Sequence, residues 1–198
     1  MSSRSSKKPE RKPGTKRANT RAQLIDAAWK LFRENGISAT SLEEVAAQAG
    51  MTKGAIYGNF ENKDDLVFAV AMNKLPVQRP VFRPGLSLEK QVAQLADQAI
   101  ARSKEAIKHL AFMSEMDLYA LTHEGLRERM GAFARARYEQ VAADIKASIP
   151  ESELPMPALE FTVVIYALFN SLTYQRAVLP DIVTDKTFAR TMALLLRR

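Results

Sequence analysis

The chain of 198 residues contains no cysteine and only two histidines. Without cysteine it can form no disulfide framework, no thiolate zinc site and no cysteine nucleophile. His109 and His123 stand near opposite ends of one expected helix, roughly 21 Å apart along its axis, so one metal ion cannot bind both. We therefore expect no metal site and no cofactor.

Long apolar runs are also missing. No segment approaches the roughly 18 residues that a membrane span requires, and the N-terminal sequence MSSRSSKKPERKPGTKRANTR lacks the apolar centre of a signal peptide. We expect a cytoplasmic protein with no membrane partner. The sequence also has no glycine-rich phosphate loop, no GxSxG elbow and no HExxH pair, so we do not expect an enzyme.

Positive charge is present in excess, and the excess is confined to one end. The formal net charge is +7, and residues 1–21 hold eight basic side chains and one acidic one, whereas the two signs balance over residues 22–198. Residues 1–19 contain Ser, Pro and Gly among these charges, which predicts a disordered basic tail. Such a tail either contacts nucleic acid phosphates or only keeps the protein soluble.

Apolar residues recur at helical spacing from Thr20 onward, and no period-two alternation bounded by turns occurs, which predicts an all-α fold. Ser41 and Glu44 form a capping box, Gly50 ends a short helix, and Thr52 can cap the next one. These signals predict about nine helices, near residues 20–35, 42–49, 53–59, 63–75, 88–103, 104–122, 124–148, 158–178 and 185–196.

Two short helices joined by a glycine-centred turn over residues 42–59 have the form of a helix-turn-helix, whose second helix enters the DNA major groove. With Ile56 facing inward, Lys53, Gly54 and Tyr57 face outward. Glycine lets the helix axis approach base edges, while lysine and tyrosine reach phosphates or bases. A glycine at position 58 is explained equally well by close approach of the helix to DNA and by a loosened helix end.

The segment TRAQLIDAAWKLFRENGISATSLEEVAAQAGMTKGAIYGNFENKDDL, residues 20–66, resembles the DNA-binding signature of the TetR family of bacterial transcriptional regulators. The order of elements, the turn glycines and the AGMTKGAIYxxF core carry the resemblance. One position departs from it, because most members have histidine where this chain has Asn59. The resemblance implies DNA contacts at Thr40, Ser41, Thr52, Lys53, Gly54, Tyr57, Asn59 and Lys63.

The resemblance also implies an all-helical homodimer with a three-helix DNA-binding domain and a larger domain that holds a small-molecule pocket. We therefore divide the chain into the tail at 1–19, a helix-turn-helix domain at 20–66 and a ligand-binding and dimerisation domain at 67–198. In similar proteins the last two long helices form a four-helix bundle between protomers. In those proteins ligand binding typically moves the helix that corresponds to residues 63–75 here, and this movement releases operator DNA.

The sequence of residues 157–179 supports a dimer independently, because it is apolar nearly all round and must be covered on every side. One side facing the protomer's own core and the other facing a partner satisfies this, although a monomer that buries the helix centrally also would. The residues expected at the dimer interface are Phe161, Ile165, Leu168, Leu172, Phe188, Met192 and Leu195.

Flexible and aromatic side chains suggest a pocket for a partly apolar effector, although such stripes are also found in ordinary cores. The residues expected to line it are Phe112, Met113, Met116, Tyr119, Arg137, Tyr138, Tyr166 and Asn170. Arg137 falls in line with the inward face of its helix. A buried arginine requires a carboxylate, from Asp117 or from an acidic ligand, and exposure at the helix edge is the alternative.

These features together predict a repressor that binds a palindromic operator as a homodimer and is released by a small molecule. An activator, or a regulator that works through protein partners, would share every N-terminal feature. A small-molecule-binding protein that has lost operator binding is a further alternative.

Overall fold

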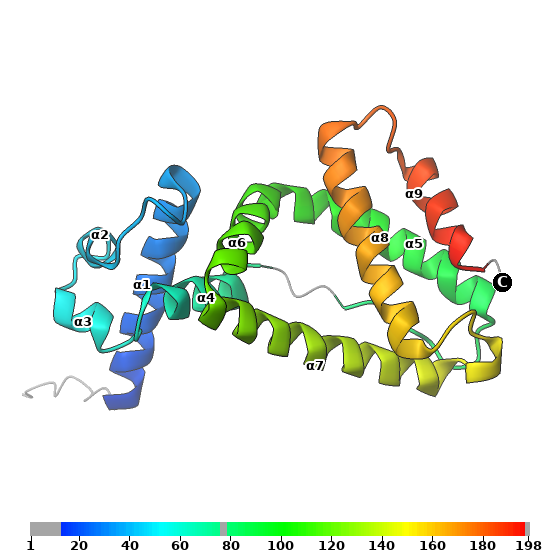
Figure 1. The fold of residues 1–198 in the computed structure, drawn as a ribbon, viewed down its shortest axis with the longest axis horizontal. Helices are drawn as coiled ribbons and strands as arrows, with labels where there is room; N and C mark the ends of the chain where they lie inside the picture. Colours follow the sequence, from blue (N-terminus) through cyan, green and yellow to red (C-terminus); the bar gives the residue numbers. More distant parts are fainter. Residues whose placement is uncertain (1–12, 76–78, 197–198) are drawn as a thin grey trace, which may run out of the picture. The chain divides into compact units, whose positions relative to one another are not determined.

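The computed structural model describes residues 13–75 and 79–196, and all regular structure in these ranges is helical, in agreement with the predicted all-α fold. Figure 1 shows the helices in chain order. Their bounds are α1 Pro13–Asn35, α2 Leu42–Gln48, α3 Lys53–Tyr57, α4 Lys63–Lys74, α5 Leu88–Ala106, α6 Leu110–Thr122, α7 Glu124–Ser148, α8 Ala158–Val178 and α9 Asp185–Met192. None of the helices in these ranges is both long and apolar enough to cross a bilayer.

The helices form two compact units, of which the first ends at Lys74 and the second begins at Leu75. In the first unit α1 packs against α2, α3 and α4. The sequence-based division placed the boundary at residue 66, which cuts through α4 and assigns most of it to the second domain. The structure differs because α4 buries Val67 and Val70 completely, which joins it to the helix-turn-helix. The core of this unit contains Leu24, Phe32, Ile37, Val45, Ile56, Phe60, Leu66, Val67 and Val70.

The first helix begins earlier than predicted, at Pro13. Residues 13–19 are therefore helical, and the prediction of a disordered tail is wrong for them; residues 1–12 lie outside the described part of the chain. Proline is compatible with the first position of a helix, because its missing N–H has no partner there in any case.

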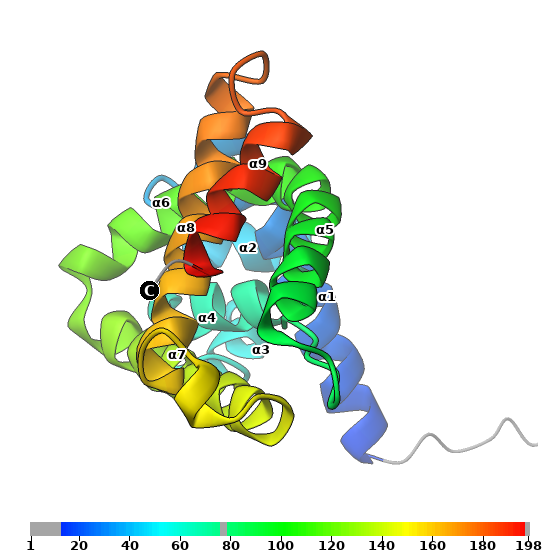
Figure 2. The ribbon, with the colours of Figure 1, turned by 90° about the vertical axis from the view of Figure 1, so that its right-hand side faces the viewer.

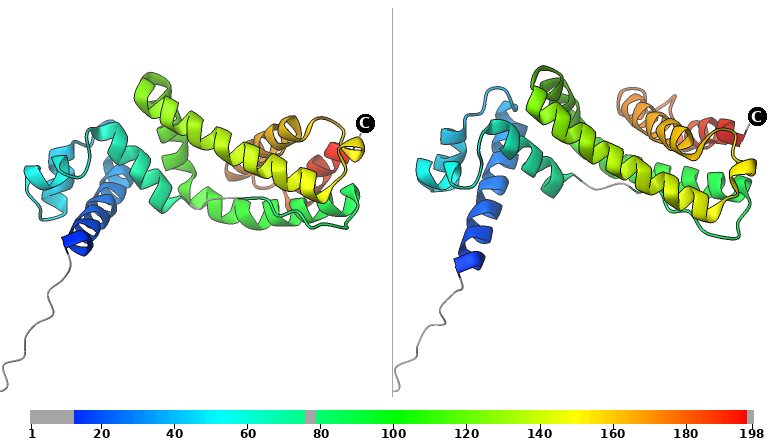
Figure 3. Two further views of the ribbon diagram at one scale, coloured as in Figure 1. Left: turned by 90° about the horizontal axis from the view of Figure 1, so that it is seen from below. Right: turned by 60° about the horizontal axis from the view of Figure 1, so that its bottom comes forward.

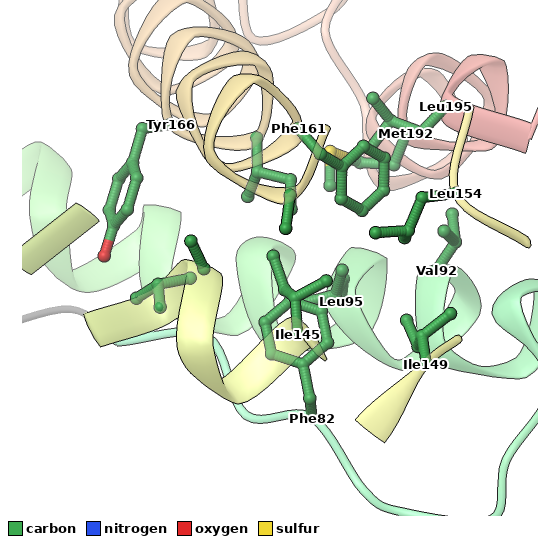
Figure 4. Packing of buried hydrophobic residues seen from close by; sticks show 14 of the residues in the cluster. Phe82, Val92, Leu95, Ile145, Ile149, Leu154, Phe161, Tyr166, Met192 and Leu195 are labelled. Atoms are coloured by element: carbon green, nitrogen blue, oxygen red, sulfur yellow. The ribbon is translucent and has the colours of Figure 1, made fainter. Parts of the chain in front are cut away.

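The second unit is built on α5, α7, α8 and α9. Figure 2 shows α5, α8 and α9 side by side, and Figure 3 shows the long α7, against which both α6 and α8 pack. Figure 4 shows their shared core, with Tyr166 at its edge. The buried side chains labelled there are Phe82, Val92, Leu95, Ile145, Ile149, Leu154, Phe161, Tyr166, Met192 and Leu195.

The predicted dimer interface is wrong for six of its seven residues. Phe161, Ile165, Leu172, Phe188, Met192 and Leu195 are buried within the single chain, and Leu168 packs against the same core. A helix that is apolar on every side gives no sequence signal for which side faces inward. The outward face of α8 consists of another set, namely Leu159, Val163, Ala167, Asn170, Tyr174 and Val178.

Candidate functional site

The helix-turn-helix is set by local hydrogen bonds at the start of α2. The Ser41 N–H donates to Glu44 Oε2 at 2.7 Å, and the Glu44 N–H donates to Ser41 Oγ at 3.2 Å, which confirms the capping box. These bonds from Ser41 hold the pKa of the Glu44 carboxyl below its ordinary value, because they stabilise the charged form. At the other end Gly50 has a φ of 65°, a left-handed conformation that glycine adopts without strain, and it turns the chain toward α3.

The short helix α3 is capped by Thr52, whose Oγ1 accepts from the Ala55 N–H at 3.3 Å. Ile56 and Phe60 are almost completely buried and fix the helix to its own unit. The opposite face is open, because 73% of the Lys53 side chain and 51% of Tyr57 are exposed. The structure thus presents a small surface formed by Thr52, Lys53, Gly54, Tyr57 and Gly58, which we call the α3 face.

The two glycines of the α3 face differ in their surroundings. A Cβ atom at Gly58 would lie 3.1 Å from the Gly54 carbonyl oxygen, so a larger residue there requires the backbone to shift. A Cβ atom at Gly54 would meet only Thr52 Oγ1, at 3.8 Å, which is ordinary contact. The fold itself therefore gives a reason for glycine at 58 and none at 54.

A carboxylate from α2 holds the two long side chains of the α3 face. The Tyr57 hydroxyl donates to Glu43 Oε1 at 2.9 Å, and Lys53 Nζ lies 3.5 Å from the same oxygen. The Tyr57 hydrogen bond is the main reason why the pKa of Glu43 is below its ordinary value, and the same bond raises the pKa of Tyr57. Glu43 thus occupies the position in which a phosphate oxygen could bind the same two donors.

Two arginines of α1 support the far end of α3, and the sequence reasoning assigned both to the basic end of the chain without a structural role. Arg17 Nη2 donates to the Gly58 carbonyl at 3.3 Å, and Arg21 Nη1 donates to the Asn59 carbonyl. The Arg21 guanidinium also lies 4.2 Å from the centre of the Phe60 ring. Their spacing of four residues, which places them on one helix face, was the available signal.

The remaining predicted DNA contacts are turned toward the protein. Thr40 is only 2% exposed, and its hydroxyl donates to the Gly36 carbonyl at 2.8 Å, so the prediction of a surface hydroxyl is wrong there. Asn59 Nδ2 donates to the Ala55 carbonyl at 2.8 Å, and Lys63 Nζ donates to the Ser38 carbonyl at 3.0 Å. These two side chains therefore stabilise the unit itself.

A small cavity lies in the second unit, between α5, α8 and α9. Its volume is about 20 Å³, which is sufficient for one water molecule. Apart from the polar groups of Arg102 and Tyr166 its walls are apolar, and the lining residues are Pro80, Leu95, Ala99, Arg102, Ile165, Tyr166, Phe169 and Met192. Within the described residues, no three His, Cys, Asp or Glu side chains gather in a metal-binding arrangement.

Of the eight residues predicted to line a pocket, only Tyr166 lines this cavity. Tyr138 stacks on the Tyr166 ring at 4.7 Å, and the Arg137 guanidinium lies 4.8 Å from the centre of that ring, so both are one layer away. None of the predicted residues of α6 lines this cavity: Phe112, Met116 and Tyr119 are buried elsewhere in the unit, and Met113 is partly buried. Asn170 is exposed on α8, which contradicts the prediction that it lines a pocket. The other lining residues were missed because distant segments bring them together.

The family profile described as bacterial regulatory proteins, tetR family, matches residues 24–70, which contain α2, α3 and most of α4. The helix-turn-helix domain belongs to the TetR family. The AcrR regulator of Shigella flexneri is 46% identical over 56 residues, which are 28% of this chain and 26% of AcrR. The chain thus carries a TetR-type DNA-binding domain of the kind found in bacterial transcriptional regulators.

The similarity outside that domain is lower. The HTH-type transcriptional regulator SrpR of Pseudomonas putida is 24% identical over 150 residues, which cover 74% of this chain and 68% of SrpR. The crystal structure of NalD, the secondary repressor of the MexAB-OprM multidrug efflux pump in Pseudomonas aeruginosa, matches with a TM-score of 0.57 at 24% identity and covers 90% of this chain and 94% of that one. The TetR-type fold therefore extends over both units.

Proposed function

We propose that this chain is a homodimeric repressor that binds a palindromic operator through α3 and is released by a small organic effector. The observation that carries the proposal is the α3 face. Its two long polar side chains project from a helix of five residues whose other side is fixed by Ile56 and Phe60. Such a helix can enter the major groove without disturbing its own core.

The proposed dimer surface is the outward face of α8. Leu159, Val163, Tyr174 and Val178 are exposed apolar side chains, and with Ala167 and Asn170 they follow one another at steps of three or four residues. These steps place all six on one stripe of the helix. A mainly apolar stripe of this length, interrupted by Asn170, supports packing against the same helix of a second protomer, since a two-fold interface uses one patch twice.

The proposed release mechanism is a competition between two geometries of the dimer. Operator binding requires the two α3 helices to reach successive major grooves, about 34 Å apart along the DNA. An effector lowers DNA affinity only if it binds more tightly to a geometry with another spacing. The fold shared with NalD, which is described as a repressor, supports this choice over activation, and the cavity beside Tyr166 supports a small effector.

The direct test is DNA binding by the full chain. The DNA that flanks its own coding region is cut into labelled fragments, and binding is measured by fluorescence anisotropy and by footprinting at several salt concentrations. We expect one protected palindrome and an affinity that falls steeply with salt, because each phosphate contact releases a counterion. The Lys53→Ala variant should bind this site at least about tenfold more weakly.

Two outcomes would contradict the proposal. If no fragment and no random-sequence selection yields salt-sensitive binding, the protein has lost operator binding and is a small-molecule-binding protein. If a palindrome is bound but deletion of the gene lowers the output of a reporter placed behind it, the protein is an activator. The oligomeric state is measured separately by sedimentation, where a monomer at micromolar concentration would exclude the α8 interface.

A further inference from the structure

Three arginines of the second unit act on one tyrosine. Arg79 precedes α5, Arg102 lies on α5, Arg137 lies on α7, and each of them interacts electrostatically with Tyr166 of α8. Tyr166 is buried and forms part of the cavity wall together with Arg102. One of the three arginines thus lines the cavity directly, and all three act on a tyrosine of its wall.

Among the residues that the structure describes, a carboxylate neutralises one of these three charges. Arg79 donates through Nε to Asp144 Oδ2 at 3.0 Å and forms a second bond to it through Nη2. Arg102 donates to the Arg79 carbonyl and, at 3.1 Å, to Gln98 Oε1, which are both neutral acceptors. Neither Arg102 nor Arg137 has a carboxylate partner among the residues that the structure describes.

Arg137 is the clearest case of an incomplete environment. Its guanidinium carbon lies 4.8 Å from the centre of the Tyr166 ring and 5.8 Å from the centres of the Phe133 and Tyr138 rings. Aromatic faces attract the positive charge, but they do not accept its hydrogen bonds in the way that an oxygen does. Arg137 Nε is buried and has no hydrogen-bond partner within the described chain. The predicted carboxylate partner, Asp117, does not supply one.

A planar guanidinium with unused N–H groups matches the two oxygens of a carboxylate. The apolar part of the wall, formed by Leu95, Ile165 and Phe169, matches a hydrocarbon body. The cavity holds only about one water molecule, so a ligand enters by displacing side chains. Met192, an unbranched and adaptable side chain in this wall, is suited to such a movement.

We propose that the effector of this protein is an amphipathic organic anion, whose carboxylate binds Arg102 and Arg137 while its apolar body lies against α5 and α8. The role of this anion as an effector rests on the proposed function, whereas its binding to the second unit does not. A cationic or neutral apolar molecule would offer no carboxylate to the two guanidinium groups. Partial burial lowers the pKa of Arg102, and the same burial strengthens its attraction for an anion.

The test measures binding to the full chain without DNA, by isothermal titration calorimetry. The probes are octanoate and palmitate, each compared with the alcohol and the alkylammonium ion of the same chain length. We expect the better carboxylate to bind at least about tenfold more tightly than its alcohol, with the ammonium ion weakest. Equal or tighter binding of the alcohol or the ammonium ion would overturn the proposal, as would the absence of carboxylate binding at millimolar concentration.

Variants separate recognition from structure. Arg137→Gln should weaken carboxylate binding about tenfold and leave alcohol binding unchanged, whereas Arg137→Lys should keep part of the difference. The matched control is Arg135→Gln, an exposed arginine of the same helix, which should change neither. A loss of alcohol and carboxylate affinity in equal proportion would mean that Arg137 only supports the fold, and it would refute the proposed contact.

The same complexes then test the proposed function independently. DNA is added to the protein with and without the carboxylate that binds best. If the carboxylate binds but DNA affinity is unchanged, the ligand class holds and ligand-induced release fails. If DNA is released by a molecule that is not an anion, release holds and the ligand class fails.

Discussion

The substitution Gly54→Ala should affect folding and DNA binding in opposite directions. A Cβ atom at this position meets nothing closer than Thr52 Oγ1 at 3.8 Å, and the residue lies in helix α3 with an ordinary helical neighbourhood. Alanine is favoured over glycine in a helix by about 0.5–1 kcal/mol, chiefly because it restricts the unfolded chain. The variant should therefore melt slightly above the native protein, by about 2 °C.

Its DNA affinity should fall, because the added methyl group stands on the surface that we place against the base edges. Filling a closely packed contact with one extra methyl group costs about 1–3 kcal/mol, which corresponds to roughly 5- to 150-fold in affinity. Melting of the first unit is followed by fluorescence of Trp29, the single tryptophan of the chain, and operator affinity by anisotropy.

The matched control is Gly131→Ala. Gly131 is an exposed glycine of α7, and a Cβ atom there meets nothing within 4 Å. It should stabilise its own helix by a similar amount and leave DNA affinity unchanged. If Gly54→Ala binds the operator as tightly as the native protein, close approach of α3 to DNA is not the reason for this glycine. A lower melting temperature would show that the space around Gly54 is not open.

Four further predictions concern the same surfaces. Glu43→Gln should raise operator affinity a few-fold, most at low salt, because Lys53 and Tyr57 then no longer have to break their contacts with a carboxylate in order to bind phosphate. Anisotropy at two salt concentrations measures this affinity. A weaker complex would mean that Glu43 positions Lys53 and Tyr57 for DNA binding. Arg21→Gln should destabilise the first unit by about 1 kcal/mol, measured by Trp29 fluorescence, because the Asn59 carbonyl and the Phe60 ring lose a cation. Val163→Asp should convert the dimer to monomers in sedimentation without unfolding them, and an unchanged dimer would place the interface elsewhere. Removal of residues 1–12, which carry five basic side chains, should flatten the salt dependence of DNA binding, and an unchanged slope would show that they contact no phosphates.

The parts of the structure that could be predicted are those fixed by neighbouring residues. Ser41, Thr52 and Ser87 cap the helices that follow them, and Gly50 turns the chain with a positive φ, because each of these roles depends on the chemistry of three or four consecutive positions. The α3 face followed from the same kind of information. Once Ile56 is known to face inward, helical geometry leaves few choices for its neighbours.

The parts that could not be predicted depend on distant segments. The inward side of α8 is decided by α5, α7 and α9, and its own sequence is apolar on every side, so three buried residues of α8, Phe161, Ile165 and Leu172, were assigned to a dimer surface. The structural role of Arg17 and Arg21 in α1 was also missed, because their acceptors are 41 and 38 residues away in the sequence. The positive charge of this segment suggested a solvated tail. In the structure, Arg17 and Arg21 instead donate hydrogen bonds to the carbonyl groups that follow α3.

If both proposals hold, the two ligands of this protein are anions, and this affects how release must be tested. A carboxylate at high concentration could weaken DNA binding simply by adding ionic strength, because the operator complex is sensitive to salt. Arg137→Gln distinguishes the two effects, since it leaves the α3 face unchanged and removes one guanidinium group from the second unit. Release that persists in this variant at the same concentration is ionic competition at the DNA surface. Release that disappears together with the difference between carboxylate and alcohol binding originates at the arginines around Tyr166.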